Sequence, residues 1–385
     1  MVLQYTAIGI QNDVWNCQTR ADYQKNLNYV ADSIRRTFWV SKLDLPVRLV
    51  ALGEGALSGW STWGGGEGHF KTYKELAPEI PGEETDFLGE LCKEMDFYLI
   101  GQMQAKDVEL MENRVFNIAF IIDPKGEIIH KHHKTAFFPL EDMTAPSDIW
   151  DVYIEKYGDD PVKLFEALYP VARTEIGNIG TIICAEGSFP EAARGLALNG
   201  AEIIWRATYP EPWTGNHMFE IQNRAHAIFN TCYVIGPNPG DRYGLKYGDN
   251  VSLARISAGN SHIIDFRGNI ISQYLGTGES YVSAIINIDG LRDFRLRGQW
   301  QNLVKDLRIE EYKAIYDAMM AKGGIYPKNL CIEEPPLTAD DQAELERYQI
   351  NKMVELGIYT PLPDWKPYTI KKELLERIEK AKKKR

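Results

Sequence analysis

The chain has few cysteines, no excess of positive charge and no long apolar run, and each absence narrows its possible functions. Its five cysteines are scattered and form no Cys-x-x-Cys pair, which argues against a zinc ribbon or a thioredoxin-type site. The net charge of -11 argues against nucleic acid as the main partner, because phosphate binding needs a basic surface. No apolar run approaches the ~20 residues that cross a bilayer, and the first residues show no signal-peptide pattern. We therefore expect a cytoplasmic protein with no nucleic-acid and no membrane partner.

The composition and patterning indicate a folded core followed by a helical extension. Hydrophobic residues make up 44% of the 385 residues and charged residues 25%, as in soluble globular proteins. Up to residue 290, short apolar runs alternate with segments of helical spacing, which predicts packed α and β layers. Within this part, residues 172–184 are expected to form a strand. We predict a core domain over residues 1–290 and a charge-rich extension over residues 291–385 that packs on the core or on a neighbouring subunit.

Three side chains with useful chemistry each follow a predicted strand end. Glu54 comes after the apolar run at residues 47–52, Lys134 after a hairpin strand, and Cys184 at a bend before the helical pattern near Pro190. Such a bend lies near the positive end of a helix dipole, which favours the thiolate and exposes the sulfur. Taken one at a time, each residue has an ordinary explanation: Glu54 as a surface glutamate, Lys134 as a solvated lysine and Cys184 as a structural cysteine. Together they supply a general base, an oxyanion stabiliser and a nucleophile.

Two other patterns suggest ligands but lack the geometry to bind them. His132 and His133 are neighbours in Lys-His-His-Lys, and adjacent residues of a strand point to opposite faces. They could not readily share one metal ion, so we expect no metal site. The glycines at residues 64–66 are not followed by Gly-Lys-Ser/Thr, so they do not form a phosphate-binding loop.

The order glutamate, lysine, cysteine resembles the nitrilase superfamily of carbon-nitrogen hydrolases. Its three motifs are matched by Gly-Glu-Gly-Ala-Leu-Ser-Gly-Trp at 53–60, by the hairpin from Gly126 to Lys134, and by Ile-Cys-Ala-Glu-Gly-Ser-Phe-Pro-Glu at 183–191. Shorter matches occur at residues 117–119, 224–230 and 260–265. The resemblance spans residues 3 to 290 and contains the three motifs in the family's order.

This resemblance implies a four-layer α-β-β-α sandwich that needs no metal or organic cofactor. It implies a homodimer or higher homo-oligomer that assembles through the helix after the cysteine and the next long helix. It also implies that Cys184 attacks a carbonyl or nitrile carbon while Glu54 acts as the base. Lys134 and the N–H of Ala185 would stabilise the oxyanion, and water would then hydrolyse the thioester.

The motif details favour the amidase and formamidase branch. Ala185 stands where the nitrilase branch has tryptophan, which counts against nitriles, whereas Gly187 and the sequence at residues 203–206 resemble amidases. Those relatives carry a second glutamate after the lysine, and Glu141 is the candidate here, one residue nearer than the pattern expects. A solvated loop glutamate is the alternative interpretation. Phe229 stands where a glutamate is common in the family. The N-carbamoyl amide hydrolase branch tolerates this change, so that function remains an alternative.

The sequence also suggests a substrate pocket. We predict that residues 142–170 form a lid or pocket wall, with an insertion used for subunit contact as the alternative. Aromatic residues near the motifs could select a larger or aromatic acyl group, although aromatic residues also occur in ordinary cores. The substrate-binding candidates are Ala185, Trp60, Phe138, Trp205 and Tyr209.

The predicted function is hydrolysis of a small amide through a cysteine thioester, with release of ammonia and a carboxylic acid. An N-carbamoyl amide hydrolase and a nitrilase are the catalytic alternatives. A catalytically silent scaffold on the same fold is a third, but it would have no chemical need for Glu54, Lys134 and Cys184. A glutaminase module would require a fused synthetase domain, which the chain lacks.

Overall fold

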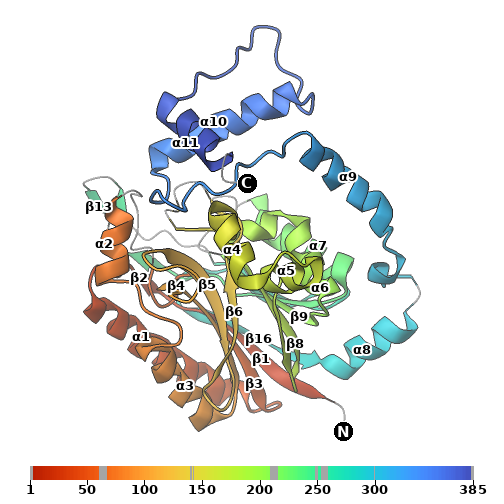
Figure 1. Ribbon diagram of the computed structural model, residues 1–385. Helices are drawn as coiled ribbons and strands as arrows, with labels where there is room; N and C mark the ends of the chain where they lie inside the picture. The colour runs from red at the N-terminus through yellow and green to blue at the C-terminus, as the bar shows by residue number, and fades with distance from the viewer. Residues whose placement is uncertain are drawn as a thin grey trace.

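Two six-stranded sheets lie face to face at the centre of the molecule (Figure 1). The structure, a computed structural model, describes residues 3–59, 67–138, 141, 143–208, 216–247, 250–252, 259–298 and 300–382. The first sheet has the order β16 (Ser280–Asn287), β1 (Gln4–Gln11), β3 (Val47–Leu52), β4 (Tyr98–Lys106), β5 (Val115–Ile122) and β6 (Ile128–His133). The second has the order β15 (Ile270–Tyr274), β14 (Ser261–Ile264), β10 (Tyr233–Gly236), β9 (Ile203–Ala207), β8 (Gly177–Ile183) and β7 (Val171–Thr174).

Helices cover the outer face of each sheet. Helices α1 (Arg20–Ser41) and α3 (Glu83–Met95) pack on the first sheet, and α6 (Pro190–Leu198) and α7 (Met218–Asn230) pack on the second. The predicted four-layer α-β-β-α sandwich is therefore confirmed. Smaller elements at the edges are α2 (Glu67–Glu75), the ribbon of β2 (Val14–Trp15) with β11 (Arg242–Tyr243), and the ribbon of β12 (Leu245–Tyr247) with β13 (Asn250–Ser252).

Alternation along the strands explains why both faces of each sheet are apolar. In β3, Leu49 and Ala51 lie in the core between the sheets, whereas Val50 and Leu52 belong to the cluster that contacts α1 and α3. Side chains of a strand point to opposite faces in turn, so a strand buried on both faces must be apolar throughout.

Residues 172–184 form two strands rather than the single expected strand. β7 and β8 pair as a hairpin in which Thr174 lies opposite Gly177. Gly177 has φ +122°, a backbone conformation that residues with a Cβ rarely adopt. This glycine therefore reverses the chain, and only β8 leads to Cys184.

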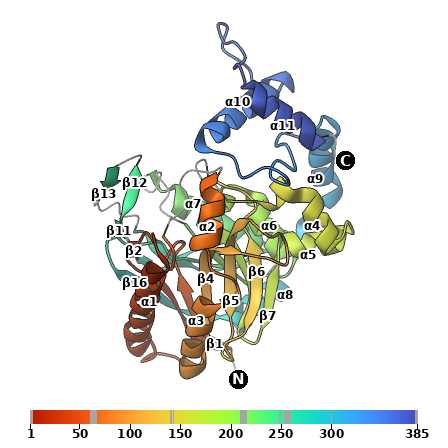
Figure 2. The same cartoon turned by 60° about the vertical axis from the view of Figure 1, so that its left-hand side comes forward.

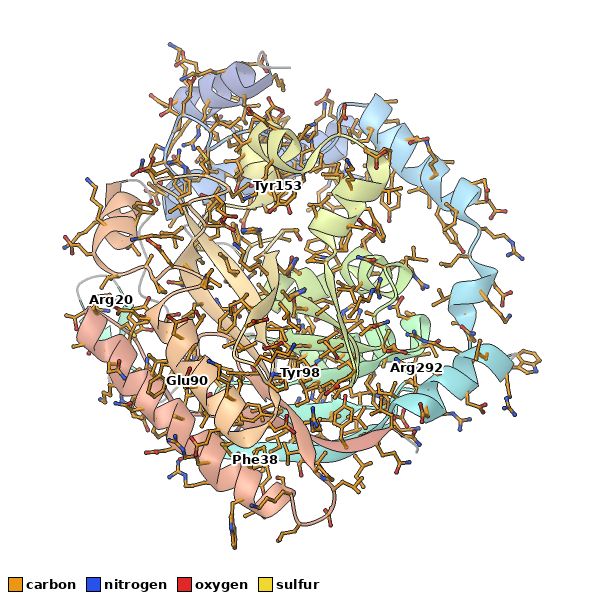
Figure 3. The ribbon with its side chains drawn as sticks, turned by 60° about the horizontal axis from the view of Figure 1, so that its bottom comes forward. Arg20, Phe38, Glu90, Tyr98, Tyr153 and Arg292 are labelled. Carbon is orange, nitrogen blue, oxygen red and sulfur yellow. The ribbon has the colours of Figure 1, made fainter. Side chains whose placement is uncertain are left out.

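The C-terminal extension packs on its own chain. After α8 (Ile288–Arg297) and η4 (Leu303–Asp306), α9 (Ile309–Ala321) runs along the outside, and α10 (Ala339–Glu355) and α11 (Lys372–Lys382) sit at one end of the sandwich (Figures 1 and 2). Leu345 and Leu374 share a core cluster with Tyr153, which is labelled in Figure 3. A domain boundary at residue 290 stays a prediction.

Residues 142–170, the predicted lid or wall, contribute three short helical elements. These are η1 (Pro146–Ile149), α4 (Trp150–Tyr157) and α5 (Pro161–Leu168). Tyr153 of α4 is fully buried, and its hydroxyl donates to the carbonyl of Ala167 at 2.9 Å. The segment is thus packed between the sandwich and the extension. Within the described ranges, no helix has the length and apolar character needed to cross a bilayer.

Replacing Ile121 by alanine should lower the free energy of unfolding by about 2–5 kcal/mol, because it opens a cavity between the sheets. Ile121 is wholly buried there, whereas Ile129 on the neighbouring strand is 37% exposed. Ile129→Ala is therefore the control and should cost less than about 1 kcal/mol. Urea unfolding of both variants measures the difference, and equal losses would contradict the two-sheet core.

Candidate active site

The three predicted catalytic side chains lie just beyond the carboxyl ends of three strands. Glu54 follows β3, Lys134 follows β6, and Cys184 follows β8 of the other sheet. The side chains of Glu54 and Lys134 are wholly buried, and Cys184 is 6% exposed. The structure therefore brings residues from both sheets into one buried group.

Lys134 is the cation of this group. Its Nζ donates to Glu141 Oε1 at 2.6 Å and Oε2 at 2.9 Å, and to Glu54 Oε1 at 3.5 Å. Burial alone would lower the pKa of Lys134, but the neighbouring acidic groups of Cys184, Glu141 and Glu54 outweigh burial and raise it above its ordinary value. Lys134 is thus a permanent ammonium that faces two carboxylates.

Two amide side chains orient Glu54. Asn117 Nδ2 donates to Glu54 Oε1 at 3.0 Å, and Gln102 Nε2 donates to Asn117 Oδ1 at 2.6 Å. Gln102 also accepts from the backbone N–H of Gly55 at 2.8 Å, so the amides hold both the side chain and the loop of Glu54. Asn117 belongs to one of the shorter family matches, but its role as the partner of Glu54 was not predicted.

Glu141 is buried and paired, so the alternative of a solvated loop glutamate is wrong. Besides Lys134, its carboxylate accepts from the backbone N–H of Phe138 at 3.1 Å. Burial raises the pKa of Glu141 to about 7; Lys134 opposes the shift and Glu54 adds to it. A catalytic role for this second glutamate stays a prediction.

Cys184 does not have the exposed thiolate that the bend was expected to favour. The 3-10 turn η2 (Cys184–Ser188) separates it from α6, and the cysteine itself has φ +48°. Burial and then the charge of Glu54 raise the pKa of the Cys184 thiol, and Lys134 only partly opposes them. Thr208 Oγ1 donates to the sulfur at 3.2 Å. The resting group is therefore a buried thiol that needs a base.

Glu186 joins the lysine loop to the cysteine turn, a function that sequence reasoning missed. Its carboxylate accepts from the N–H of Ile183 and the N–H of Thr135, both at 2.7 Å, and pairs with His132 Nε2 at 3.0 Å. Burial would raise the pKa of Glu186, but His132 and these hydrogen bonds hold it below its ordinary value. The position of Glu186 in the cysteine motif was the one feature of the sequence that could have indicated this role.

The histidines of the Lys-His-His-Lys run have separate partners. His132 pairs with Glu186, whereas His133 Nε2 lies 3.1 Å from Asp107 Oδ2. Within the described ranges, no three His, Cys, Asp or Glu side chains are grouped to hold a metal ion.

Three of the five substrate-binding candidates lie in described parts of the structure, and they have different surroundings. Phe138 is half-buried and lines a cavity of about 580 Å³ together with Glu141. Trp205 is wholly buried between the sheets, where its indole N–H donates to the carbonyl of Leu52 at 2.9 Å, a position that favours a structural role. Ala185 is half-buried at the start of η2, and its part in the oxyanion site stays a prediction. Trp60 and Tyr209 lie outside the described residues.

Comparison with known proteins assigns the family. A sequence profile of carbon-nitrogen hydrolases matches residues 6–296, more than half of the chain. The chain belongs to the carbon-nitrogen hydrolase family. The predicted membership of the nitrilase superfamily and the predicted enzyme class are thereby confirmed.

Individual relatives of this carbon-nitrogen hydrolase support the same family assignment. It is 30% identical over 221 residues to the probable hydrolase nit2 of Schizosaccharomyces pombe, covering 56% of this chain and 67% of that protein. It is 28% identical to the omega-amidase NIT2 of Xenopus tropicalis (58% and 74% covered) and 28% identical to a formamidase of Bacillus cereus (63% and 64% covered).

Solved structures share the fold. A carbon-nitrogen hydrolase from Helicobacter pylori has a TM-score of 0.60 at 19% identity, with 81% of this chain and 98% of that chain covered. Saccharomyces cerevisiae Nit3 has a TM-score of 0.57 at 21% identity, with 77% and 95% covered.

The carboxyl of Glu141 should make stability depend on pH in a defined direction. Its pKa is raised from an ordinary value of 4.5 to about 7, so the folded state binds this proton more tightly than the unfolded state. The resulting stabilisation is fully present below 4.5 and is lost as the pH rises through about 7. Urea unfolding measures the free energy of unfolding of the unsubstituted chain and of Glu141→Gln. The difference between them should shift in favour of the unsubstituted chain when the pH is lowered from about 8 to about 5.

The control for loss of a carboxylate is Glu83→Gln, since the Glu83 side chain is 94% exposed. A stability difference between the chain and Glu141→Gln that does not change with pH would show that Glu141 is not held in this buried group.

Proposed function

We propose that this carbon-nitrogen hydrolase cleaves small amides through a thioester at Cys184 and releases ammonia and a carboxylic acid. The observation that carries the proposal is the buried group in which Lys134 contacts two carboxylates and interacts electrostatically with the Cys184 thiol. A buried ion group of this kind is costly, and catalysis is a reason to retain it.

In the first half of the reaction, Glu54 accepts the thiol proton as the sulfur of Cys184 attacks the amide carbon. The new S–C bond moves the carbonyl electrons onto oxygen, where Lys134 and the N–H of Ala185 stabilise the charge. The tetrahedral intermediate then reforms the carbonyl and breaks its C–N bond. Glu54 returns the proton to the departing nitrogen, so ammonia leaves and a thioester remains.

In the second half, water takes the position that ammonia has left. Glu54 accepts a proton from this water as its oxygen attacks the thioester carbon. The second tetrahedral intermediate is stabilised at the same oxyanion position. Its collapse breaks the S–C bond, the sulfur regains the proton from Glu54, and the carboxylic acid leaves.

Amides are favoured over nitriles and N-carbamoyl compounds by the surroundings of the group. Glu141 contacts the lysine directly, as expected for the second glutamate of the amidase and formamidase branch. Ala185 follows the nucleophile where nitrilases have tryptophan. Gly187 fits the same branch, and a Cβ at this glycine would collide with the guanidinium of Arg206. Relatives named as a formamidase and an omega-amidase support the same choice.

Replacing Cys184 by alanine should lower kcat/KM for a primary amide by about 10⁴-fold or more, because the nucleophile is lost. Lys134→Gln should lower kcat by about 10²–10³-fold, because it removes one of the groups that stabilise the oxyanion. Ammonia release measures both. Cys92→Ala is the matched control, since Cys92 is a second buried thiol in the helix-facing core.

Unchanged ammonia release by Cys184→Ala would contradict the proposal. A panel of amides, N-carbamoyl compounds and nitriles that reads both ammonia and carbon dioxide separates the alternatives. Carbon dioxide release would favour the N-carbamoyl amide hydrolase, and acid from nitriles alone would favour the nitrilase. No turnover of the panel and no mass adduct at Cys184 would favour a silent scaffold.

A cytoplasmic location and a homo-oligomeric state belong to the same proposal. The scattered reduced thiols support the first. Helices α6 and α7, which the family resemblance assigns to the subunit contact, expose apolar side chains that support the second: Leu198, Ile221, Ile228 and Phe229.

Placing a charge on this surface should therefore reduce the oligomer mass. Ile221→Lys is expected to shift the mass in light scattering toward the monomer, because an unpaired charge in an apolar contact is costly. Val40→Lys, on the exposed side of α1, is the control. An unchanged mass for Ile221→Lys would argue against a contact through α7.

A further inference from the structure

A cavity of about 580 Å³ separates the Glu141 loop from the C-terminal extension. The core side contributes Phe138, Met143 and Phe189 to its lining, and the extension contributes Tyr326, Leu337 and Leu345. Its volume falls within the roughly 300–1,000 Å³ typical of small-molecule sites. The extension therefore builds one wall of a cavity that begins at a residue of the candidate active site.

Hydrogen bonds fix this wall in place. Gln342 Nε2 of α10 donates to the backbone carbonyl of Glu141 at 2.6 Å. The N–H of Cys331 donates to the carbonyl of Asp148 at 2.9 Å, and the N–H of Asn329 donates to the carbonyl of Ser147 at 2.9 Å. The extension is thus attached both to the Glu141 loop and to η1, on two sides of the cavity.

The charge of the lining has one sign. Besides Glu141, the cavity is lined by Asp148, which is 4% exposed, and by Glu346 of α10. Among the described lining residues there is no lysine, arginine or histidine. Lys134 pairs with Glu141 and is not itself part of the lining. A ligand carboxylate would therefore lose its hydration without meeting a cation of the lining, and it would lie near the carboxyl groups of Asp148 and Glu346.

We propose that this cavity receives the part of the amide substrate beyond the scissile bond, and that it admits an uncharged or cationic chain but not a carboxylate. Residues 325–349 of the extension, Leu345 among them, are the specificity-determining wall. The inference rests on the proposed function, because Glu141 joins the cavity to Lys134 and so to the reacting group.

Four amides test the selectivity. Hexanamide, 6-aminohexanamide and the monoamide of adipic acid share a six-carbon chain and differ in its end. Acetamide lacks this chain and serves as the internal reference. Relative to acetamide, kcat/KM for the first two should exceed that for the adipic monoamide by about tenfold or more, as expected for one unpaired buried charge. Equal values for all three six-carbon amides would overturn the inference.

Leu345→Arg tests the wall itself, because it places a cation in the cavity. The ratio of kcat/KM for the adipic monoamide to that for hexanamide should rise by about tenfold or more, as a new charge pair predicts. Ile350→Arg carries the same substitution on the more exposed side of α10 and should leave the ratio unchanged. A ratio that Leu345→Arg leaves unchanged would show that the extension does not contact the substrate.

Failure of the proposed function has a different outcome, since acetamide would then not be hydrolysed either. In that case calorimetric binding of hexanamide and of the adipic monoamide to the Cys184→Ala variant tests the cavity. Tighter binding of hexanamide supports the inference, and equal or tighter binding of the adipic monoamide overturns it.

Discussion

The burial of one lysine ammonium constrains the rest of the site. An isolated buried charge costs several kcal/mol or more, so Lys134 requires the two carboxylates that contact it. Each carboxylate in turn is held by its own donors, Glu54 by Asn117 and Glu141 by the N–H of Phe138. These hydrogen bonds fix the side chains of Glu54, Lys134 and Glu141 relative to one another, which preorganises the oxyanion position before a substrate arrives.

The same charges keep the nucleophile at rest. Burial and the charge of Glu54 raise the pKa of the Cys184 thiol, so the proton stays on sulfur until attack. A permanently ionised thiol would be more open to oxidation and alkylation. Glu186 accepts hydrogen bonds from the backbone beside Cys184 and from the backbone beside Lys134. It therefore holds the nucleophile and the cation in fixed relative positions.

Local patterns predicted packed α and β layers and placed Glu54, Lys134 and Cys184 after strand ends, because strands and turns depend on residues that are neighbours in the sequence. The four-layer sandwich was implied by the family resemblance. Contacts between distant segments were not predictable in this way. Thr208 on the sulfur and Gln342 on the Glu141 loop depend on packing across layers. The thiolate prediction was wrong because burial and the charge of Glu54 raise the pKa of the thiol, and because η2 lies between the sulfur and the start of α6. The hairpin before Cys184 was missed although polar residues and a glycine, Thr174, Glu175 and Gly177, interrupt the apolar pattern at the turn.

Partitioning of the acyl group between water and hydroxylamine tests the thioester at Cys184 most directly. An amide and an ester with the same acyl group should both pass through one acyl-enzyme. They should therefore give the same ratio of hydroxamate to acid at a given hydroxylamine concentration. A ratio that depends on the leaving group, or no hydroxamate from either substrate, would contradict the covalent mechanism.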